Sequence, residues 1–374
     1  MNWRIKMLGL FIAVSFFTLL AGCKTLANRS TLTIEPTVMA KTETPSFEPG
    51  ITLAPPETGS PAKPVIIDTD MAADDWMAIL YLLQRTDISV KAITVSGTGE
   101  AHCQPGIKNV LGLVALAGDE KIPVSCGRET PLQGDHVFPD EWRTGVDGLY
   151  GLSLPKSETA ASNLPAVGLI SEAIRTSPVP ITFLTLGPLT NLAEVFQEDP
   201  SLADSIEMVY IMGGAVHVPG NIAVSGAGIA NEVAEWNIYI DPLATRIVFE
   251  SGVPITLVPL DATNDVPLSR EFYVALENRH NTPEAGFVYD FYTTNDYLFD
   301  FGTMYFWDQL SAVIVSDESL STFQNEPLCV DLSEGSTSGQ TKAGEGCPII
   351  RMAVSAKRAY FEQLFIETLN GTMK

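Results

Sequence analysis

Residues 63–83 read KPVIIDTDMAADDWMAILYLL, and this stretch decides the fold. It opens with the apolar run 65–67, which has the pattern of a short strand buried inside a sheet. The run ends in acidic residues, after which the mostly apolar segment 76–83 predicts a helix. Asp74 and Asp75 directly precede that helix, and negative charge is favourable at a helix N-terminus. The stretch therefore predicts a strand, an acidic turn and a helix in succession.

The same order of elements recurs along the chain. Further strands are predicted over 89–95, 181–186, 208–212 and 255–260, and further helices over 109–117 and after Asn191. Strands that alternate with helices indicate an α/β fold with a mainly parallel central sheet and helices on both faces. Ligands of such sheets bind beyond the carboxyl ends of the strands, and polar motifs repeatedly follow the strand ends here. A functional site is therefore expected at that edge of the sheet.

The composition is that of a globular protein rather than a disordered one. Hydrophobic residues make up 45% of the 374 residues, and charged residues make up only 18%. Acidic residues outnumber basic ones by 45 to 22, which gives a formal net charge of -23. Because such a surface repels phosphate backbones, the sequence argues against nucleic-acid polymers as partners.

The N-terminus has the features of an export signal. Two basic residues precede the apolar run 8–20, which is too short to span a bilayer comfortably. The run leads into Leu-Leu-Ala-Gly-Cys over 19–23, which resembles the lipobox of bacterial lipoproteins. The resemblance implies that residues 1–23 are a signal peptide ending in a lipidated Cys23. The alternative is an ordinary secretory signal with an incidental cysteine.

The segment that follows the signal differs from the rest of the chain. Residues 24–62 are rich in Thr, Pro, Ser and Glu and show no apolar period, which predicts a flexible tether. Residues 63–374 are expected to form one domain. A lipidated terminus anchors a protein without spanning the membrane. The expected location is the cell envelope, on a membrane face toward the periplasm or exterior, with the choice of inner or outer membrane open.

Export also bears on the cysteines, because the compartment outside the cytoplasm is oxidising. Cys329 and Cys347 flank the Gly/Ser-rich stretch 333–346, so a disulfide there would close a loop. That bridge would leave Cys103 to pair with Cys126. The alternative is that all four are plain buried thiols, because connectivity cannot be deduced from sequence.

Four aspartates lie within eight residues, at positions 68, 70, 74 and 75. Carboxylates this close repel one another unless something positive lies among them, and no Lys or Arg occurs within the cluster. A hard divalent cation with oxygen ligands would resolve the repulsion. The alternative, acids that decorate a helix N-terminus, accounts for one or two of the carboxylates but not for four.

The cluster resembles the Asp-x-Asp-x-x-x-Asp-Asp signature of the inosine–uridine nucleoside hydrolase family. The resemblance extends from about residue 64 to the C-terminus and includes four further motifs in the family's order. They are Leu-Gly-Pro-Leu-Thr-Asn at 186–191, Met-Gly-Gly-Ala at 212–215 with Gly220-Asn221, Ala-Glu-Trp-Asn-Ile-Tyr-Ile-Asp-Pro at 234–242, and Trp307-Asp308. It implies a Rossmann-like nucleoside hydrolase fold over 63–374 and a homodimer or homotetramer.

The resemblance also assigns roles to individual residues. One calcium ion would be bound by Asp70, Asp75, Asp308 and the backbone carbonyl of Leu186. The ribose would be held by Asp74, Asn221, Glu235 and Asn237. Asp68 would support the acidic loop from behind. Asp70 would also act as general base for a calcium-bound water, and the N-glycosidic bond would break through an oxocarbenium-like transition state.

Glu235 and Asn237 alternate with Trp236 and Ile238, which predicts a strand whose polar pair shares one face. The alternative is a surface polar pair without a role in the site.

The residues expected around the base indicate a purine. One branch of the family has a His before the late metal-binding Asp, whereas this sequence has Trp307, as in the purine-preferring branch. Trp142 lies in a segment that resembles that branch's second stacking residue, and flat purines stack well on aromatic rings. Glu100 lies near the position of a base-contacting acid in that branch, and His136 is a candidate proton donor if its loop closes. The alternative for both tryptophans is a role in the core.

Two other functions compete with nucleoside hydrolysis. Asp68-Thr69-Asp70 after a strand is also typical of aspartyl phosphatases, which use Mg²⁺ and need a downstream Lys that the later strand ends lack. A nucleoside-binding lipoprotein that keeps the fold without catalysis is the second alternative.

Overall fold

The computed structural model describes residue 53 and residues 61–373. The predicted signal peptide, Cys23 and nearly all of the predicted tether lie outside the described residues. The strands are β1 Lys63–Thr69, β2 Ile88–Val95, β3 Val124–Cys126, β4 Ile181–Thr185, β5 Ile206–Met212, β6 Ile255–Val258, β7 Ser321–Val330, β8 Thr341–Ala343 and β9 Ile349–Ala356. The α-helices are α1 Ala73–Leu83, α2 Cys103–Leu116, α3 Asp140–Asp147, α4 Ala166–Thr176, α5 Thr190–Glu198, α6 Trp236–Ile240, α7 Pro242–Glu250, α8 Leu260–Thr263, α9 Arg270–Glu277, α10 Pro283–Thr294, α11 Trp307–Ser316 and α12 Arg358–Leu369. Short 3₁₀ helices are η1 Leu149–Gly151, η2 Pro200–Ser205, η3 Ala223–Ser225, η4 Asp296–Asp300 and η5 Glu318–Leu320.

The strands form one sheet in the order β3-β2-β1-β4-β5-β6-β9-β7-β8. Neighbours from β3 to β9 run parallel, whereas β7 runs antiparallel to both β9 and β8. The prediction of an α/β fold with a mainly parallel sheet is therefore confirmed. The antiparallel edge was not predicted.

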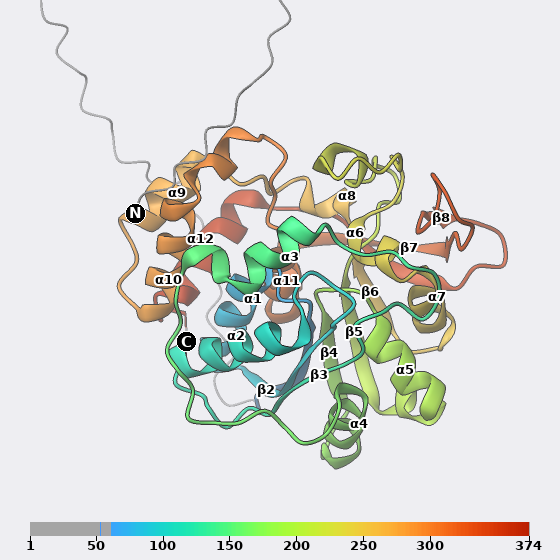
Figure 1. The fold of residues 1–374 in the computed structure, drawn as a ribbon, viewed down its shortest axis with the longest axis horizontal. Helices are drawn as coiled ribbons and strands as arrows, with labels where there is room; N and C mark the ends of the chain where they lie inside the picture. Colours follow the sequence, from blue (N-terminus) through green and yellow to red (C-terminus); the bar gives the residue numbers. More distant parts are fainter. Residues whose placement is uncertain (1–52, 54–60, 374) are drawn as a thin grey trace, which may run out of the picture. The chain divides into compact units, whose positions relative to one another are not determined.

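Helices cover both faces of the sheet, because side chains of a strand point alternately to opposite faces. Val65 and Ile67 of β1 pack into a core cluster with α1, α2, α10, α11 and α12. Ile66, between them, packs into a second cluster with α4, α5 and α7. Figure 1 shows the two helical layers on opposite sides of the strands. A strand buried on both faces explains the continuous apolar run that opens the domain.

The order of the strands reverses between β1 and β4. The chain runs outward from β1 to β2 and β3 on one side, and from β4 to β5 and β6 on the other. Asp68 lies in register with Thr94 of β2 and Thr185 of β4, so all three strands end together. A crevice opens at such a reversal and is where ligands bind in open parallel sheets. The acidic turn after β1 lies at this point.

The predicted strand around residues 235–237 is wrong, because residues 236–240 form the short helix α6. Glu235 caps this helix: its carboxylate accepts hydrogen bonds from the backbone N–H groups of Asn237 and Ile238, at 2.8 and 3.2 Å. A capped first turn satisfies N–H groups that a strand would have to pair with a neighbour. Alternation over four residues was too short a pattern to separate the two structures. The helix predicted over 109–117 exists but begins earlier, at Cys103.

Both cysteine pairs are disulfides, so the alternative of free buried thiols is excluded. Cys103–Cys126 joins the start of α2 to the end of β3. Cys329–Cys347 closes the hairpin that contains β7 and β8. No helix in the described part of the chain combines the length and the apolar character that crossing a bilayer requires.

Candidate active site

A cavity of about 650 Å³ lies beyond the carboxyl ends of β1, β4 and β5. This volume is in the range of sites for small molecules. The wall combines carboxylates of the acidic turn with many aromatic rings. Of the predicted site residues, those in the wall are Asp70, Asp74, Glu100, Trp142, Leu186, Asn221, Glu235, Asn237, Trp307 and Asp308. Residues from both ends of the domain sequence therefore meet in one cavity.

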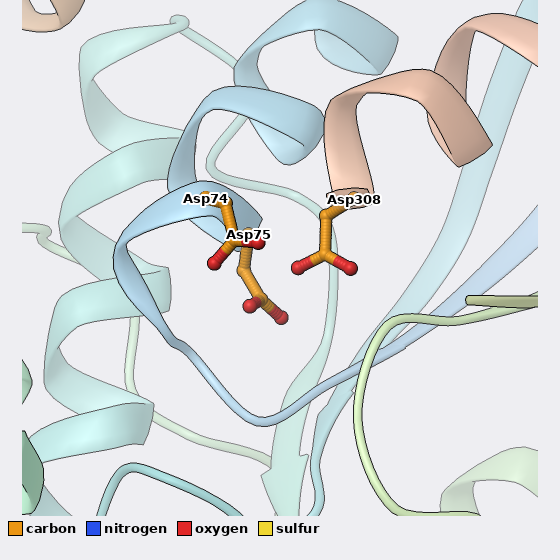
Figure 2. Close-up of side chains that lie close together, drawn as sticks. All are labelled: Asp74, Asp75 and Asp308. Carbon is orange, nitrogen blue, oxygen red and sulfur yellow. The ribbon is translucent and has the colours of Figure 1, made fainter. Parts of the chain in front are cut away.

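Three carboxylates come together at the N-terminal ends of two packed helices. Asp74 and Asp75 lie in the first turn of α1, and Asp308 lies in the first turn of α11. Figure 2 shows the three side chains converging from these two helices. They offer ligand oxygens that all lie within 4.8 Å of one another. Both helix dipoles direct their positive ends toward this cluster, which favours negative charge there.

Two oxygens of this cluster lack a hydrogen-bond partner. Asp75 Oδ2 and Asp308 Oδ1 are buried and have no donor within hydrogen-bonding distance among the described residues. A buried charged oxygen without a partner is strongly unfavourable. Since the atoms that could bind a metal are all hard carboxylate oxygens, a divalent cation such as calcium fits the arrangement.

Burial disfavours the charged form of each of these groups. Burial raises the pKa of Asp74 to about 7, and the negative charge of Asp70 adds to the rise. Burial also raises the pKa values of Asp75 and Asp308 well above their ordinary value, and the neighbouring aspartates raise them further. A cation among the carboxylates would reverse these shifts, because it stabilises the ionised forms.

Asp70 is held at the cavity wall by loops that follow two other strands. Its Oδ1 accepts a hydrogen bond from Ala72 N at 3.4 Å and its Oδ2 from Glu100 N at 3.1 Å. Cβ atoms added at Gly99 and Gly187 would lie 2.1 and 2.6 Å from Asp70 Cβ, so only glycine fits at either position. Burial raises the pKa of Asp70 to about 6. Asp70 was predicted to bind the metal, but it does not belong to the cluster of carboxylates whose oxygens lie within 4.8 Å of one another. That cluster consists of Asp74, Asp75 and Asp308.

The turn between β1 and α1 wraps around one oxygen of Asp75. Asp75 Oδ1 accepts hydrogen bonds from the hydroxyl of Thr69 and from the backbone N–H groups of Asp70 and Met71, the last two at 3.2 and 3.3 Å. Met71 adopts φ 61°, a left-handed conformation that is uncommon outside glycine. These contacts fix Asp75 through one oxygen and leave the other, Oδ2, without a hydrogen-bond partner among the described residues.

Asn237 and Glu235 contact the backbone as well as the cavity. Asn237 Nδ2 donates to the carbonyl of Leu186 at 2.9 Å and to that of Met212 at 3.2 Å, so it holds the ends of β4 and β5 together. Glu235 also accepts from Gly214 N at 3.0 Å, and burial raises its pKa to about 7. Asn221 differs, because its Oδ1 is buried in the cavity wall without a partner among the described residues.

Asp68 lies behind the acidic turn rather than in the cavity wall. Its Oδ1 accepts hydrogen bonds from the hydroxyl of Thr94 at 2.5 Å and from Asn191 Nδ2 at 2.8 Å. The side chain is fully buried, and burial raises its pKa to about 7. A phosphatase nucleophile has to reach its substrate, so this position argues against the aspartyl-phosphatase alternative.

Trp142 and Trp307, the residues expected to stack on a base, both lie in the cavity wall. Trp142 packs edge-on against Trp236, with ring centroids 5.2 Å apart. Phe138 stacks on the ring of Trp236. His136 lies elsewhere, because its ring stacks on Tyr239 at 3.9 Å and its Nδ1 contacts the Tyr239 carbonyl at 2.5 Å. No histidine is found among the described residues that line the cavity.

Several wall residues were not predicted from the sequence. All five are aromatic. Two of them, Tyr297 and Phe301, are exposed to solvent, and the other three are Tyr150, Phe291 and Tyr292. The density of aromatic residues between 287 and 307 was a usable signal. It could not show which rings face the cavity, because no simple period connects them.

Comparison with known proteins identifies a family to which the chain is similar. The family described as inosine-uridine preferring nucleoside hydrolase matches residues 65–363. The pyrimidine-specific ribonucleoside hydrolase RihA of Citrobacter koseri is 37% identical over 210 residues, which are 56% of this chain and 64% of that protein. The RihA of Escherichia coli O7:K1 is 36% identical with the same coverage, so the match spans less than two thirds of these curated relatives.

Two solved structures cover more of the chain. A plant nucleoside hydrolase, the PpNRh1 enzyme, is 30% identical with a TM-score of 0.74, and the match covers 83% of this chain and 99% of that one. The purine-preferring ribonucleoside hydrolase of Gardnerella vaginalis is 26% identical with a TM-score of 0.70 and the same coverage. The acidic turn, the later motifs that meet it in the cavity and these similarities lead to one conclusion: the chain belongs to the inosine-uridine preferring nucleoside hydrolase family.

Proposed function

We propose that this protein hydrolyses the N-glycosidic bond of ribonucleosides to a free base and ribose. The observation that carries the proposal is the cluster of Asp74, Asp75 and Asp308 at an aromatic cavity of about 650 Å³. A cluster of this kind both binds a hard cation and stabilises positive charge that develops on a sugar ring.

The carboxylates would divide the work on the sugar. A calcium ion bound by Asp75, Asp308 and their neighbours would lower the pKa of a water beside the anomeric carbon. Asp70, fixed by two backbone N–H groups, would accept a proton from that water. The surrounding negative charge would favour the oxocarbenium-like transition state over the neutral ground state.

The ribose would be held by the polar part of the cavity wall. The unpartnered Asn221 Oδ1 can accept a hydrogen bond from a sugar hydroxyl. Asp74, Asn237 and Glu235 line the same cavity, which supports the proposal that they hold one sugar together. The backbone contacts of Glu235 keep its carboxylate in one orientation before substrate arrives.

We further propose a preference for purine nucleosides. Trp142 and Trp307 offer large ring surfaces in the cavity wall, and a purine buries more area against such rings than a pyrimidine does. The curated relatives named above are pyrimidine-specific, which makes the pyrimidine the competing substrate class.

A nucleoside panel with ribose detection tests the function. The full-length protein, purified in detergent, is expected to release ribose from inosine, adenosine or guanosine faster than from uridine or cytidine. Turnover should disappear on chelation and return with added calcium. Asp70→Ala should also abolish turnover, and a cooperative thermal unfolding transition should show that this variant still folds. Saturable nucleoside binding without ribose release would instead favour the non-catalytic binding protein.

We also propose that Cys23 carries a lipid that anchors the protein in the cell envelope. The basis for this proposal is the sequence of residues 1–23, in which two basic residues and the apolar run 8–20 lead into the motif at 19–23. Cys23→Ala is expected to move the protein from the membrane fraction to the soluble fraction and to prevent incorporation of labelled fatty acid. An unchanged distribution would contradict the proposal.

A further inference from the structure

Tyr150 is held in a backbone conformation that a tyrosine rarely adopts. Leu149 and Tyr150 both have left-handed backbones, with φ 53° and 46°, although neither is glycine. Two successive left-handed residues with side chains are unfavourable, because Cβ crowds the following carbonyl. Strain of this kind persists where the surrounding structure imposes it and is concentrated at functional sites.

A glycine inside the neighbouring helix leaves room for the Tyr150 side chain. Gly145 lies inside helix α3, where glycine is a poor helix former. A Cβ at Gly145 would lie 2.4 Å from Tyr150 Cε1, so any larger residue would displace the ring. The helix that carries Trp142 therefore also leaves the space that Tyr150 occupies.

The ring is fixed while its hydroxyl stays unpartnered. The Tyr150 ring packs against Trp76 and Phe291, with centroid distances of 6.3 and 6.2 Å. The side chain belongs to the cavity wall, and among the described residues its hydroxyl has no hydrogen-bond partner. Burial raises the pKa of Tyr150, and the charges of Glu100 and Asp74 add to the rise. The hydroxyl therefore keeps its proton at neutral pH and can donate a hydrogen bond.

We propose that Tyr150 is a catalytic residue that donates a hydrogen bond from its hydroxyl to the departing base. The inference rests on the proposed nucleoside hydrolysis. As the bond between the anomeric carbon and the base breaks, its electron pair moves to the base, whose ring nitrogens and carbonyl oxygens become more negative. A donor that strengthens its bond to these atoms in the transition state increases the rate. This role matters here because no described wall residue is a histidine.

The test compares two substrates that differ only in their need for such a donor. A nucleoside has a poor leaving group, whereas p-nitrophenyl β-D-ribofuranoside releases a stable phenolate without help. For Tyr150→Phe we expect kcat on the best nucleoside to fall by about 10- to 100-fold, in line with the loss of one transition-state donor. The KM should change by less than about threefold, and turnover of the nitrophenyl riboside should stay near that of wild type.

Two controls keep a structural effect separate from a catalytic one. Tyr273→Phe removes a surface hydroxyl that contacts Thr293 at 3.1 Å outside the cavity, and it should leave both substrates unaffected. Tyr150→Gly should relieve the backbone strain and lose nucleoside turnover at least as much as Tyr150→Phe does. Parallel losses on both substrates, or no loss with Tyr150→Phe, would overturn the role of Tyr150. Wild-type protein that cleaves neither substrate would instead overturn the proposed hydrolysis itself.

Discussion

Asp70 shows how a single side chain in this site depends on the space left by glycines. Gly99 and Gly187 come from loops after two different strands, and each approaches the Asp70 side chain more closely than any Cβ allows. Their backbones therefore set the position of the carboxylate. A side chain at either glycine would move the proposed general base away from its place in the wall.

Gly99→Ala is accordingly expected to lower kcat by about 100-fold or more, because small misplacements of catalytic groups cost rates of this order. It should also reduce the free energy of unfolding by about 1–3 kcal/mol, as overpacking does. Steady-state kinetics and denaturant unfolding measure the two effects.

Gly286→Ala is the matched control, because a Cβ there meets nothing within 4 Å and the residue lies inside helix α10. It should keep full activity and raise the free energy of unfolding by up to about 1 kcal/mol. Equal activity of both alanine variants would contradict the account of Asp70.

At the scale of elements, the hairpin containing β7 and β8 supports the segment that carries Glu235 and Asn237. Asn231 Nδ2 donates to the Ser338 carbonyl at 2.8 Å, and Asn231 Oδ1 accepts from Ala234 N at 3.0 Å. Gly339 approaches the same segment so closely that a Cβ would lie 2.6 Å from Tyr239 Cα. The Cys329–Cys347 disulfide closes this hairpin and so supports the side of the cavity that we propose holds the ribose.

Replacing both Cys329 and Cys347 with serine should therefore raise the KM for nucleosides several-fold with a smaller effect on kcat. The free energy of unfolding should fall by about 3 kcal/mol, the value expected for closing a loop of this length. Ser336→Ala, an exposed change in the same hairpin, should alter neither quantity. A stability loss with an unchanged KM would show that the hairpin does not support the site.

A structural feature could be predicted from the sequence where residues close together in the chain determine it. The buried run 65–67 and the acidic turn are local, so the strand, the helix after it and the place of the site could be predicted. Helix α6 was mistaken for a strand although its cap by Glu235 is local, because an alternation over four residues does not separate a strand from a short helix. Tyr150 was missed because its place in the wall depends on Gly145 and a strained backbone. The insertion of β9 between β6 and β7 has no local signal at all.

At the scale of the whole molecule, the acidic cluster links stability, pH and metal. In the metal-free protein, Asp74 has its pKa raised to about 7 and Asp70 to about 6, against an ordinary value of 3.8. Between about pH 4 and pH 7 the unfolded chain therefore binds fewer protons than the folded one. Stability of the metal-free protein falls as pH rises through this window.

Calcium binding needs ionised carboxylates, so it should oppose this loss more strongly at higher pH. We expect the difference in melting temperature between calcium-loaded and chelated protein to widen from pH 5 to pH 8. Thermal unfolding at fixed ionic strength measures the difference. A gap that stays constant, or narrows as pH rises, would contradict the proposal that these carboxylates bind the metal.

The strand order has a consequence for how the protein acquires its activity. β1 pairs with β4, and β9 lies between β6 and β7, so the sheet depends on contacts between distant parts of the chain. Asp70 and Asp308 come from opposite ends of the domain sequence, and such non-local topologies fold slowly. A partly synthesised chain thus has no complete site, and the return of the proposed hydrolysis during refolding would report completion of the entire sheet rather than of any local part.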